Sequence, residues 1–282
     1  MKGKTCLVTG ATSGIGLVAA EELARRGAAL ILVGRDPRRG AAALKRIKSR
    51  VPAAQVALRI ADLSRFGEIH RLAAELLATA GRIDVLVNNA GAFFDRHALT
   101  EDGVERTFAL NHMGYFLLTD LLLARLREAA PSRIVNVASE AHRGATLDFS
   151  DLAGRNGAKG WPAYRRSKLA NILFTAELAR RLEGSGVTAN CLHPGFVATR
   201  FGDAGNSLAT RAFIGLAKRV MAITPEEGGR TIVHLAGDPA VAGISGRYFI
   251  KSRAAQPSPA AQDAAAARRL WEESARLAGL AG

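Results

Sequence analysis

Tyr164 and Lys168 stand four residues apart in a stretch whose apolar spacing predicts a helix. Side chains at i and i+4 project from one face of a helix, so the phenol and the ammonium group should lie close together. A free phenol has a pKa of about 10, which is too high for a general base at neutral pH. A nearby ammonium group stabilises the phenolate and lowers that pKa, so the pair could exchange a proton with a substrate oxygen. The alternative is an exposed tyrosine beside a solvated lysine, which would usually be correct for an isolated pair.

Ser139 adds a hydroxyl group at a position that favours the catalytic interpretation. It follows the apolar run 133–138, which predicts a strand, and a hydroxyl at the carboxyl end of a strand can hydrogen-bond a substrate oxygen. The alternative is a serine that ends the strand or caps a helix. The sequence Gly160-Trp161-Pro162, just before the predicted helix, also argues against a merely exposed Tyr164.

A glycine-rich turn joins the first predicted strand to the first predicted helix. Its glycines follow the spacing G-x-x-x-G-x-G, and glycine permits the positive φ and close backbone approach that a turn over a pyrophosphate needs. The following helix start offers unpaired N–H groups and the positive end of the helix dipole. An ordinary helix-start loop can look similar, but the position of this turn favours nucleotide binding. The residues expected to hold the nucleotide here are Gly10, Thr12, Ser13, Gly14, Ile15 and Gly16.

Short apolar runs alternate with longer helical stretches along the whole chain. Apolar strands followed by helices are typical of a parallel sheet that helices cover on both faces. We therefore expect a single α/β domain over 1–282, with a doubly wound parallel sheet of the Rossmann type and no second domain. The predicted strands are 5–8, 29–33, 55–60, 85–87, 133–138, 187–192 and 247–250. The predicted helices are 14–26, 38–51, 66–80, 102–129, 163–182, 225–236 and 261–278.

Four motifs together resemble the short-chain dehydrogenase/reductase family over nearly the whole chain. They are the glycine turn, Asn88-Asn89-Ala90-Gly91, Tyr164-x-x-x-Lys168 and Pro194-Gly195. Finer details are similar to the retinol-dehydrogenase-like branch. These details are Gly34-Arg35-Asp36, Asn111-His112-Met113-Gly114, Ser167-Lys168-Leu169-Ala170-Asn171, His193-Pro194-Gly195, Ser245-Gly246-Arg247-Tyr248-Phe249 and Arg269-Leu270-Trp271.

The resemblance implies an oxidoreductase that passes a hydride between a nicotinamide cofactor and an alcohol or carbonyl carbon. It assigns Tyr164 to proton transfer, Lys168 to tuning Tyr164 and bonding the nicotinamide ribose, and Ser139 to orienting the substrate oxygen. Asn111 matches the member that helps to hold a proton relay, although a polar residue tolerated in a helix is the alternative. The family usually has two serines where this chain has Ala138-Ser139. The long interval between Ser139 and Tyr164 indicates an extended loop.

Further cofactor contacts are implied by position in the same motifs. The adenine is expected beside Asp62 and Leu63. The adenosine ribose is expected beside Asn89, Ala90 and Gly91. The nicotinamide carboxamide is expected beside Pro194, Val197 and Thr199.

The end of the second strand predicts NADP(H) over NAD(H). A carboxylate side chain at that position would accept hydrogen bonds from the two ribose hydroxyls and would repel a 2′-phosphate. This chain has Gly34 there, so no such carboxylate is present. Arg35 follows, and its guanidinium group suits phosphate geometry. Asp36 is expected to point elsewhere, and Arg38 or Arg39 could assist from the next helix.

Segments 140–162 and 200–224 follow strand ends and are expected to be substrate loops. We predict a lipophilic pocket for a bulky or retinol-like substrate, although any one of these apolar residues could simply pack a loop onto the sheet. The candidate residues are Phe93, Phe94, Leu147, Trp161, Phe196, Phe201, Phe213 and Met221. His193 is expected to be structural, whereas His142 could equally line the site or stand exposed on a loop. No HExxH or CxxC motif predicts a metal site.

Composition sets the compartment and the partners. Cys6 and Cys191 are too few for a disulfide scaffold and predict a reducing cytoplasmic setting. No apolar run reaches the roughly 18 residues that would span a bilayer, and the chain begins at its first strand, so no membrane anchor is expected. The net charge of +14 comes from scattered residues, 31 arginines and 8 lysines, which indicates solvated helix faces and no specific nucleic-acid partner. A homo-oligomer is compatible with this composition.

Two other functions use the same features. A nucleotide-binding redox sensor could share the fold without turnover, but sensors of that kind can lose the tyrosine or serine, and this chain keeps both. Only the positive net charge suggests that the protein binds nucleic acid. Measuring how its affinity for non-specific DNA depends on salt concentration would test this function.

Overall fold

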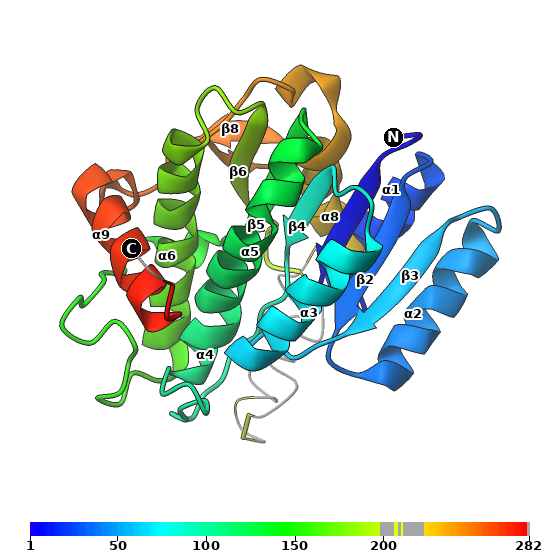
Figure 1. Cartoon of the computed structure of the whole chain (residues 1–282). Coiled ribbons are helices and arrows are strands. Elements are labelled where there is room, and N and C mark those ends of the chain that lie inside the picture. The colour runs from blue at the N-terminus through cyan, green and yellow to red at the C-terminus, as the bar shows by residue number, and fades with distance from the viewer. Residues whose placement is uncertain (198–205, 208–209, 211–222, 281–282) are drawn as a thin grey trace.

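A single eight-stranded sheet forms the centre of the computed structural model, which describes residues 1–197, 206–207, 210 and 223–280. The strand order is β3-β2-β1-β4-β5-β6-β7-β8 (Figure 1). Neighbouring strands from β3 to β7 are parallel, and only β8 runs antiparallel to its neighbour β7. The strands are β1 (Thr5–Thr9), β2 (Ala29–Gly34), β3 (Val56–Ile60), β4 (Val85–Asn88), β5 (Ser132–Val137), β6 (Val187–His193), β7 (Tyr248–Ile250) and β8 (Arg253–Ala255).

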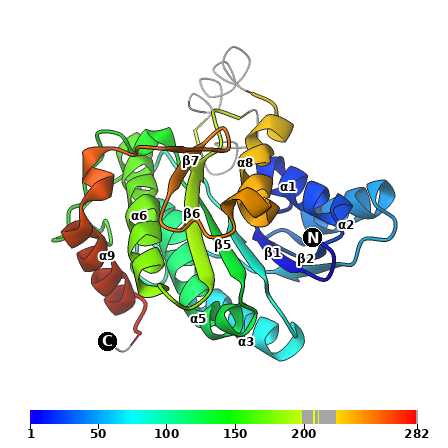
Figure 2. The ribbon, with the colours of Figure 1, turned by 90° about the horizontal axis from the view of Figure 1, so that it is seen from above.

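Helices cover both faces of this sheet. Figure 2 shows α1, α2 and α8 on one face and α3, α5 and α6 on the other, with α9 packed outside α6. The long helices are α1 (Gly14–Arg25), α2 (Pro37–Arg50), α3 (Phe66–Thr79), α5 (Gly114–Glu128), α6 (Gly160–Arg181), α8 (Pro225–Gly237) and α9 (Ala264–Leu277). The expected Rossmann-type α/β fold is therefore confirmed.

The core forms two apolar layers, one on each side of the sheet. The central strands are buried on both faces, which explains why their sequences are continuously apolar instead of alternating. Cys6 and Cys191 both lie inside this core as free thiols, and burial raises the pKa of each to about 12.

The helix predicted over 102–129 differs from the observed structure. Gly103 has a φ of 71°, and the chain first forms a short α4 (Arg106–Phe108), in which the buried Glu105 carboxylate accepts the N–H groups of the first turn. A π-helical turn, Ala109–Met113, then joins α4 to α5. The apolar spacing predicted helical structure correctly here, but it carried no sign of the wider turn.

The C-terminal end also differs from the prediction. Strand β8 was not expected, because the hairpin turn before it uses Lys251 and Ser252 at φ values of 49° and 60° and lacks the glycine or asparagine that would mark it. The last helix begins at Ala264, later than predicted, where Asp263 caps it after a 3₁₀ turn at Pro259–Gln262. None of the described helices combines the length and apolar character needed to cross a membrane.

Candidate active site

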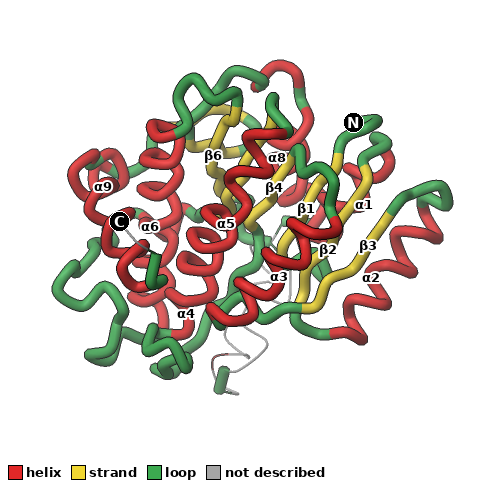
Figure 3. The backbone as a smooth tube through the Cα atoms, viewed as in Figure 1, coloured by secondary structure: helices red, strands yellow, loops and turns green. Residues whose placement is uncertain are grey.

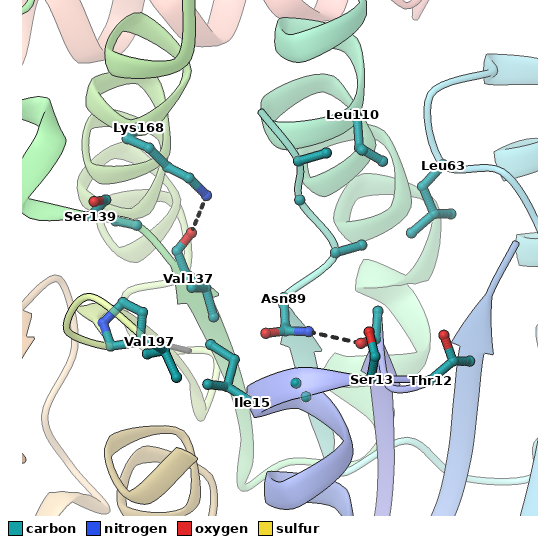
Figure 4. A pocket seen from close by; sticks show the side chains of 18 of the residues that line it. Thr12, Ser13, Ile15, Leu63, Asn89, Leu110, Val137, Ser139, Lys168 and Val197 are labelled. Carbon is teal, nitrogen blue, oxygen red and sulfur yellow. Dashed lines mark hydrogen bonds between the residues drawn. The ribbon is translucent and has the colours of Figure 1, made fainter. Parts of the chain in front are cut away.

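A cavity of about 630 Å³ lies at the carboxyl ends of the parallel strands. Its walls come from the ends of β1 to β6, from the segments that follow them, and from helix α6 (Figure 4). The predicted site residues that line it are Gly10, Thr12, Ser13, Gly14, Ile15, Gly16, Arg35, Asp62, Leu63, Asn89, Ala90, Gly91, Ser139, Tyr164, Lys168, Pro194 and Val197. Asn111 lies behind the wall, and Thr199 lies outside the described residues.

The glycine turn opens one end of this cavity. Gly10 and Gly14 adopt φ values of 64° and 57°, which lets the backbone turn sharply between β1 and α1. Ser13, the N-cap of α1, makes no side-chain cap, and the first turn contains no acidic residue. The N–H groups and the positive dipole end of α1 are therefore free to face an anionic group, which fits a pyrophosphate.

Asn89 supports the turn from below. Its side-chain amide donates to the carbonyl oxygen of Gly10 at 3.3 Å (Figure 4) and to that of Thr9 at 2.8 Å. Its backbone N–H donates to Thr9 Oγ1 at 2.9 Å. Gly16 packs directly on this amide, since a Cβ at position 16 would lie 2.3 Å from Asn89 Nδ2. The sequence predicted Asn89 beside the adenosine ribose, and the structure shows that it holds the glycine turn in shape.

The end of β2 has no room for a side chain. A Cβ at Gly34 would lie 2.4 Å from Cγ2 of Thr12. Asp36 lines the cavity, but its carboxylate is held by α2: Oδ1 accepts the Arg39 N–H at 3.1 Å, and Oδ2 pairs with Arg39 Nε at 3.2 Å. The backbone N–H of Arg39 is the main cause that lowers the pKa of Asp36. Arg35 is exposed on the cavity wall and can meet a ligand.

Asp62 and Leu63 form the opposite wall of this end. Asp62 Oδ1 accepts hydrogen bonds from the backbone N–H and the hydroxyl of Ser64, at 3.0 and 2.7 Å. The carbonyl oxygen of Leu63 lies close to Gly114 at the start of α5. A Cβ atom added to Gly114 would be only 2.6 Å from this oxygen. The wall is therefore fixed in place before any ligand binds.

Tyr164 and Lys168 project together from α6 at the other end of the cavity. The Lys168 Nζ atom donates to the carbonyl of Val137 at 2.9 Å and lies 5.7 Å from the centre of the Tyr164 ring (Figure 4). Burial raises the pKa of Tyr164 to about 12, opposed by a hydrogen bond with the Ser139 side chain, and burial lowers the pKa of Lys168 to about 7. The sequence predicted that the ammonium group lowers the pKa of the phenol, but burial of Tyr164 raises that pKa instead.

Ser139 caps a turn and also lines the cavity, so its position is compatible with both alternatives that the sequence left open. It lines the cavity beside Tyr164, and its Oγ atom accepts the N–H of Ala141 at 3.1 Å as the cap of a 3₁₀ turn, Glu140–His142. The cap fixes the rotamer of the hydroxyl on the side of the cavity.

His193 and His142, the two histidines near this turn, both have structural roles. His193 lines the cavity, and its Nδ1 atom accepts the N–H of Glu140 at 3.2 Å. His142 is neither exposed nor part of the cavity wall, which corrects both interpretations of the sequence: its side chain is fully buried.

Asn111 lies in the π-helical turn and is fully buried. Its side chain forms paired hydrogen bonds with the backbone of Ala92, at 2.9 and 3.0 Å, and donates to Ser167 Oγ at 3.0 Å. It therefore binds the segment after β4 to helix α6, next to Tyr164 and Lys168. The π turn that places it left no signal in the sequence.

The aromatic candidates for the substrate pocket divide into two groups. Trp161 and Phe196 are 52% and 41% exposed and line the mouth of the cavity. Phe93 packs edge-on against Tyr164, with ring centres 6.2 Å apart, and so supports the site from behind. Phe94 is buried under the guanidinium group of Arg106.

The remaining candidates do not contribute to the described cavity. Leu147 packs against the core, and Phe201, Phe213 and Met221 lie outside the described residues. Among the described residues, no group of three or more His, Cys, Asp or Glu side chains could hold a metal ion.

Replacing Gly16 with alanine should weaken dinucleotide binding about tenfold or more, because the added Cβ displaces Asn89 from the glycine turn. Fluorescence titration with a reduced nicotinamide dinucleotide measures this. Gly67→Ala is the matched control, since position 67 lies in α3 with open space around its Cβ, and it should bind like the wild type. Equal affinity for Gly16→Ala and Gly67→Ala would show that the Gly16–Asn89 contact does not support binding.

Comparisons with known proteins agree with this geometry. The model of the short chain dehydrogenase family matches residues 4–207. The chain is 44% identical to human retinol dehydrogenase 13 over 99% of its own length and 85% of that protein, and 42% identical to mouse retinol dehydrogenase 14 over 99% and 87%. A crystal structure of an uncharacterised protein from Mycobacterium paratuberculosis superposes with a TM-score of 0.78 at 35% identity, covering 99% of this chain and 94% of that one. An actinorhodin polyketide ketoreductase variant with NADPH superposes with a TM-score of 0.68 at 27% identity, covering 87% and 94%. The chain belongs to the short-chain dehydrogenase/reductase family, in its retinol-dehydrogenase-like branch, and is an oxidoreductase of that family.

Proposed function

We propose that this protein uses NADP(H) to interconvert an alcohol and a carbonyl compound, with Tyr164 as the proton donor and acceptor. The observation that carries this proposal is the group formed by Tyr164, Ser139 and Lys168 at one end of a cavity whose other end is an uncapped helix N-terminus. The cavity thus joins a site for an anionic dinucleotide to a site for proton transfer.

The nicotinamide cofactor, when bound, supplies or accepts the hydride. In the reductive direction, Tyr164 donates its phenolic proton to the carbonyl oxygen, and its raised pKa keeps that proton in place at neutral pH. Ser139 orients the same oxygen through its hydroxyl, whose position the 3₁₀ turn fixes. Lys168 uses one of its three N–H donors to reach Val137 and can direct another toward the ribose. In the oxidative direction Tyr164 must first lose its proton, so burial makes oxidation more dependent on high pH.

The preference for NADP(H) rests on the end of β2. Gly34 provides no carboxylate, the Thr12 side chain fills the space beside it, and the Asp36 carboxylate is neutralised by Arg39. Arg35 therefore remains as an exposed guanidinium group on the cavity wall, where it can pair with a 2′-phosphate.

We also propose that residues 1–282 act as one catalytic unit in the cytoplasm. One continuous sheet supplies both the dinucleotide end and the proton-transfer end of the cavity. Both cysteines are unpaired and buried, which is compatible with a reducing compartment.

Tyr164→Phe should reduce turnover by about 10²–10⁴-fold while cofactor affinity changes only a few-fold, because the substitution removes the exchangeable proton and little else. Steady-state kinetics in both directions, from pH 7 to 9.5, together with cofactor titration, measures this. Oxidation by the wild type should rise across that range as the phenol of Tyr164 ionises. Near-normal turnover by Tyr164→Phe would contradict the assignment. A wild type that binds the dinucleotide but turns over no alcohol or carbonyl would instead indicate a redox sensor of the same fold.

Arg35→Ala should lower affinity for NADP(H) by about 10–150-fold, since a hydrogen bond to a charged group contributes roughly 1.5–3 kcal/mol. Affinity for NAD(H) should hardly change, because that cofactor has no 2′-phosphate. Dissociation constants of both cofactors for wild type and variant provide the measurement, and Lys45→Ala, at an exposed position of α2 that does not line the cavity, is the control. Equal losses for both cofactors, or a wild-type preference for NAD(H), would refute a phosphate contact at Arg35.

The substrate should be lipophilic, because Trp161 and Phe196 present exposed aromatic surface at the cavity mouth beside Tyr164. Long apolar alcohols, aldehydes and ketones should give a higher kcat/KM than short polar ones. Trp161→Ala should raise KM for the long substrates more than for the short ones, which a panel of matched chain lengths can test. A preference of the wild type for small hydrophilic sugars would reject this pocket.

A further inference from the structure

His142 is a fully buried histidine directly behind the proposed active site. Its Nδ1 atom lies 2.7 Å from the carbonyl oxygen of Ser139, and its Nε2 atom lies 3.0 Å from the backbone nitrogen of Ser258. The backbone N–H of His142 also donates to the Ser139 carbonyl, at 3.2 Å. The histidine thus holds the peptide group of Ser139 with two donors at once.

The two partners fix the chemical form of the ring. A carbonyl oxygen can only accept a hydrogen bond, and a backbone N–H can only donate one. The ring must therefore be neutral, with its proton on Nδ1 and a lone pair on Nε2. A second proton on Nε2 would point at the N–H of Ser258 and break that hydrogen bond.

Other contacts connect the same two segments. The hydroxyl of Tyr248 donates to Glu140 Oε1 at 2.7 Å, and Arg143 donates to the carbonyl of Gln256 at 3.0 Å. The His142 ring also packs edge-on against the Tyr248 ring, with centres 5.4 Å apart. The turn that carries Ser139 is therefore held by the hairpin of β7 and β8 and by the segment after it.

We propose that His142 is a positioning residue: its neutral ring fixes the peptide group of Ser139, and through it the direction of the Ser139 hydroxyl, by tying that residue to Ser258. This inference rests on the proposed role of Ser139 in turnover. Because Ser139 Oγ must face both Ala141 and the substrate oxygen, a rotation of its peptide group would move the hydroxyl out of line.

The requirement for a neutral ring makes the device sensitive to acid. The charged and titratable groups around the ring are Glu140 and Arg143 on its own turn, Arg165 on α6, His193 at the end of β6, and Tyr248 on β7. Burial lowers the pKa of His142 below its ordinary value, opposed mainly by the hydrogen bond to Ser139 and by the charge of Glu140. Protonation therefore needs a pH below the ordinary histidine range, and it breaks the hydrogen bond to Ser258, so that the Ser139 peptide is no longer tied to that segment.

Substitutions by the two amide side chains separate the two hydrogen bonds of the ring. The asparagine amide occupies the place of Nδ1, so His142→Asn keeps a donor for Ser139 and loses the contact with Ser258. The glutamine amide reaches the place of Nε2, so His142→Gln keeps the partner of Ser258 and loses the donor to Ser139. We expect kcat for carbonyl reduction to fall at least tenfold in both variants, because each keeps only one of the two hydrogen bonds that tie Ser139 to Ser258, with cofactor affinity unchanged in both. His234→Asn, on the distant helix α8, controls for the general effect of removing a histidine and should leave kcat unchanged.

The pH profile supplies a readout that a purely structural role would not move. In the reductive direction Tyr164 and Lys168 keep their protons in acid, so neither causes a loss of rate there. The wild type should lose kcat as the pH falls below the ordinary histidine range, whereas His142→Asn, which does not titrate, should keep the low kcat of the acid form at every pH and show no such acid limb. Equal kcat in the wild type and either variant at neutral pH, or an unchanged acid limb in His142→Asn, would overturn the proposal.

Nitrogen NMR of histidine-labelled protein tests the same inference without turnover. It should show His142 as the neutral Nδ1–H tautomer from pH 8 down to about 6.5. An Nε2–H tautomer would overturn the positioning role even if the enzyme turns over, whereas a wild type without turnover but with the Nδ1–H tautomer would count against the proposed function alone.

Discussion

The site depends on the common direction of the strands. Because β1 to β7 are parallel, the turns that follow them all leave from the same edge of the sheet (Figure 3). The strand order places β1 beside β4 and β4 beside β5, so Gly10, Asn89 and Ser139 become neighbours although they are far apart in sequence. No single loop forms the cavity, and reversing or shifting any of these strands would remove one wall.

Hydrogen bonds between buried polar side chains join β4 and β5 to α5 and α6. Asn88 on β4 donates to Asn136 on β5 and to Thr119 on α5, each at 2.9 Å, and Asn136 donates to Thr175 on α6 at 2.9 Å. All of these side chains are buried, where an unpaired donor would be destabilising. The network therefore fixes α5 and α6 against the ends of two strands, and α6 carries Tyr164 and Lys168.

The sequence predicted the parts of this protein that depend on local chemistry. The glycine turn follows from the conformational freedom of glycine, and the buried strands follow from their continuous apolar runs, so both were identified correctly. The π turn around Asn111 was missed, because the same apolar spacing fits an α-helix. The burial of His142 was also missed, since it is created by Ser258, which lies 116 residues away in the sequence. The pKa directions of Tyr164 and Lys168 depend on desolvation, which no spacing in the chain reports.

The residues at the two ends of the cavity differ in burial, so substitutions at the two ends have different effects on stability. At the proton-transfer end, Lys168 is only 3% exposed and bonded to a strand carbonyl, so a substitution there leaves a buried polar group without its partner. At the other end, Arg35 is exposed, and exchanging an exposed side chain usually changes stability little. The end of the cavity at Arg35 is therefore the more adaptable one, but it has a limit at Gly34. A Cβ introduced there would lie 2.4 Å from Cγ2 of Thr12, so any side chain at position 34 needs the Thr12 side chain to move or a smaller residue at position 12.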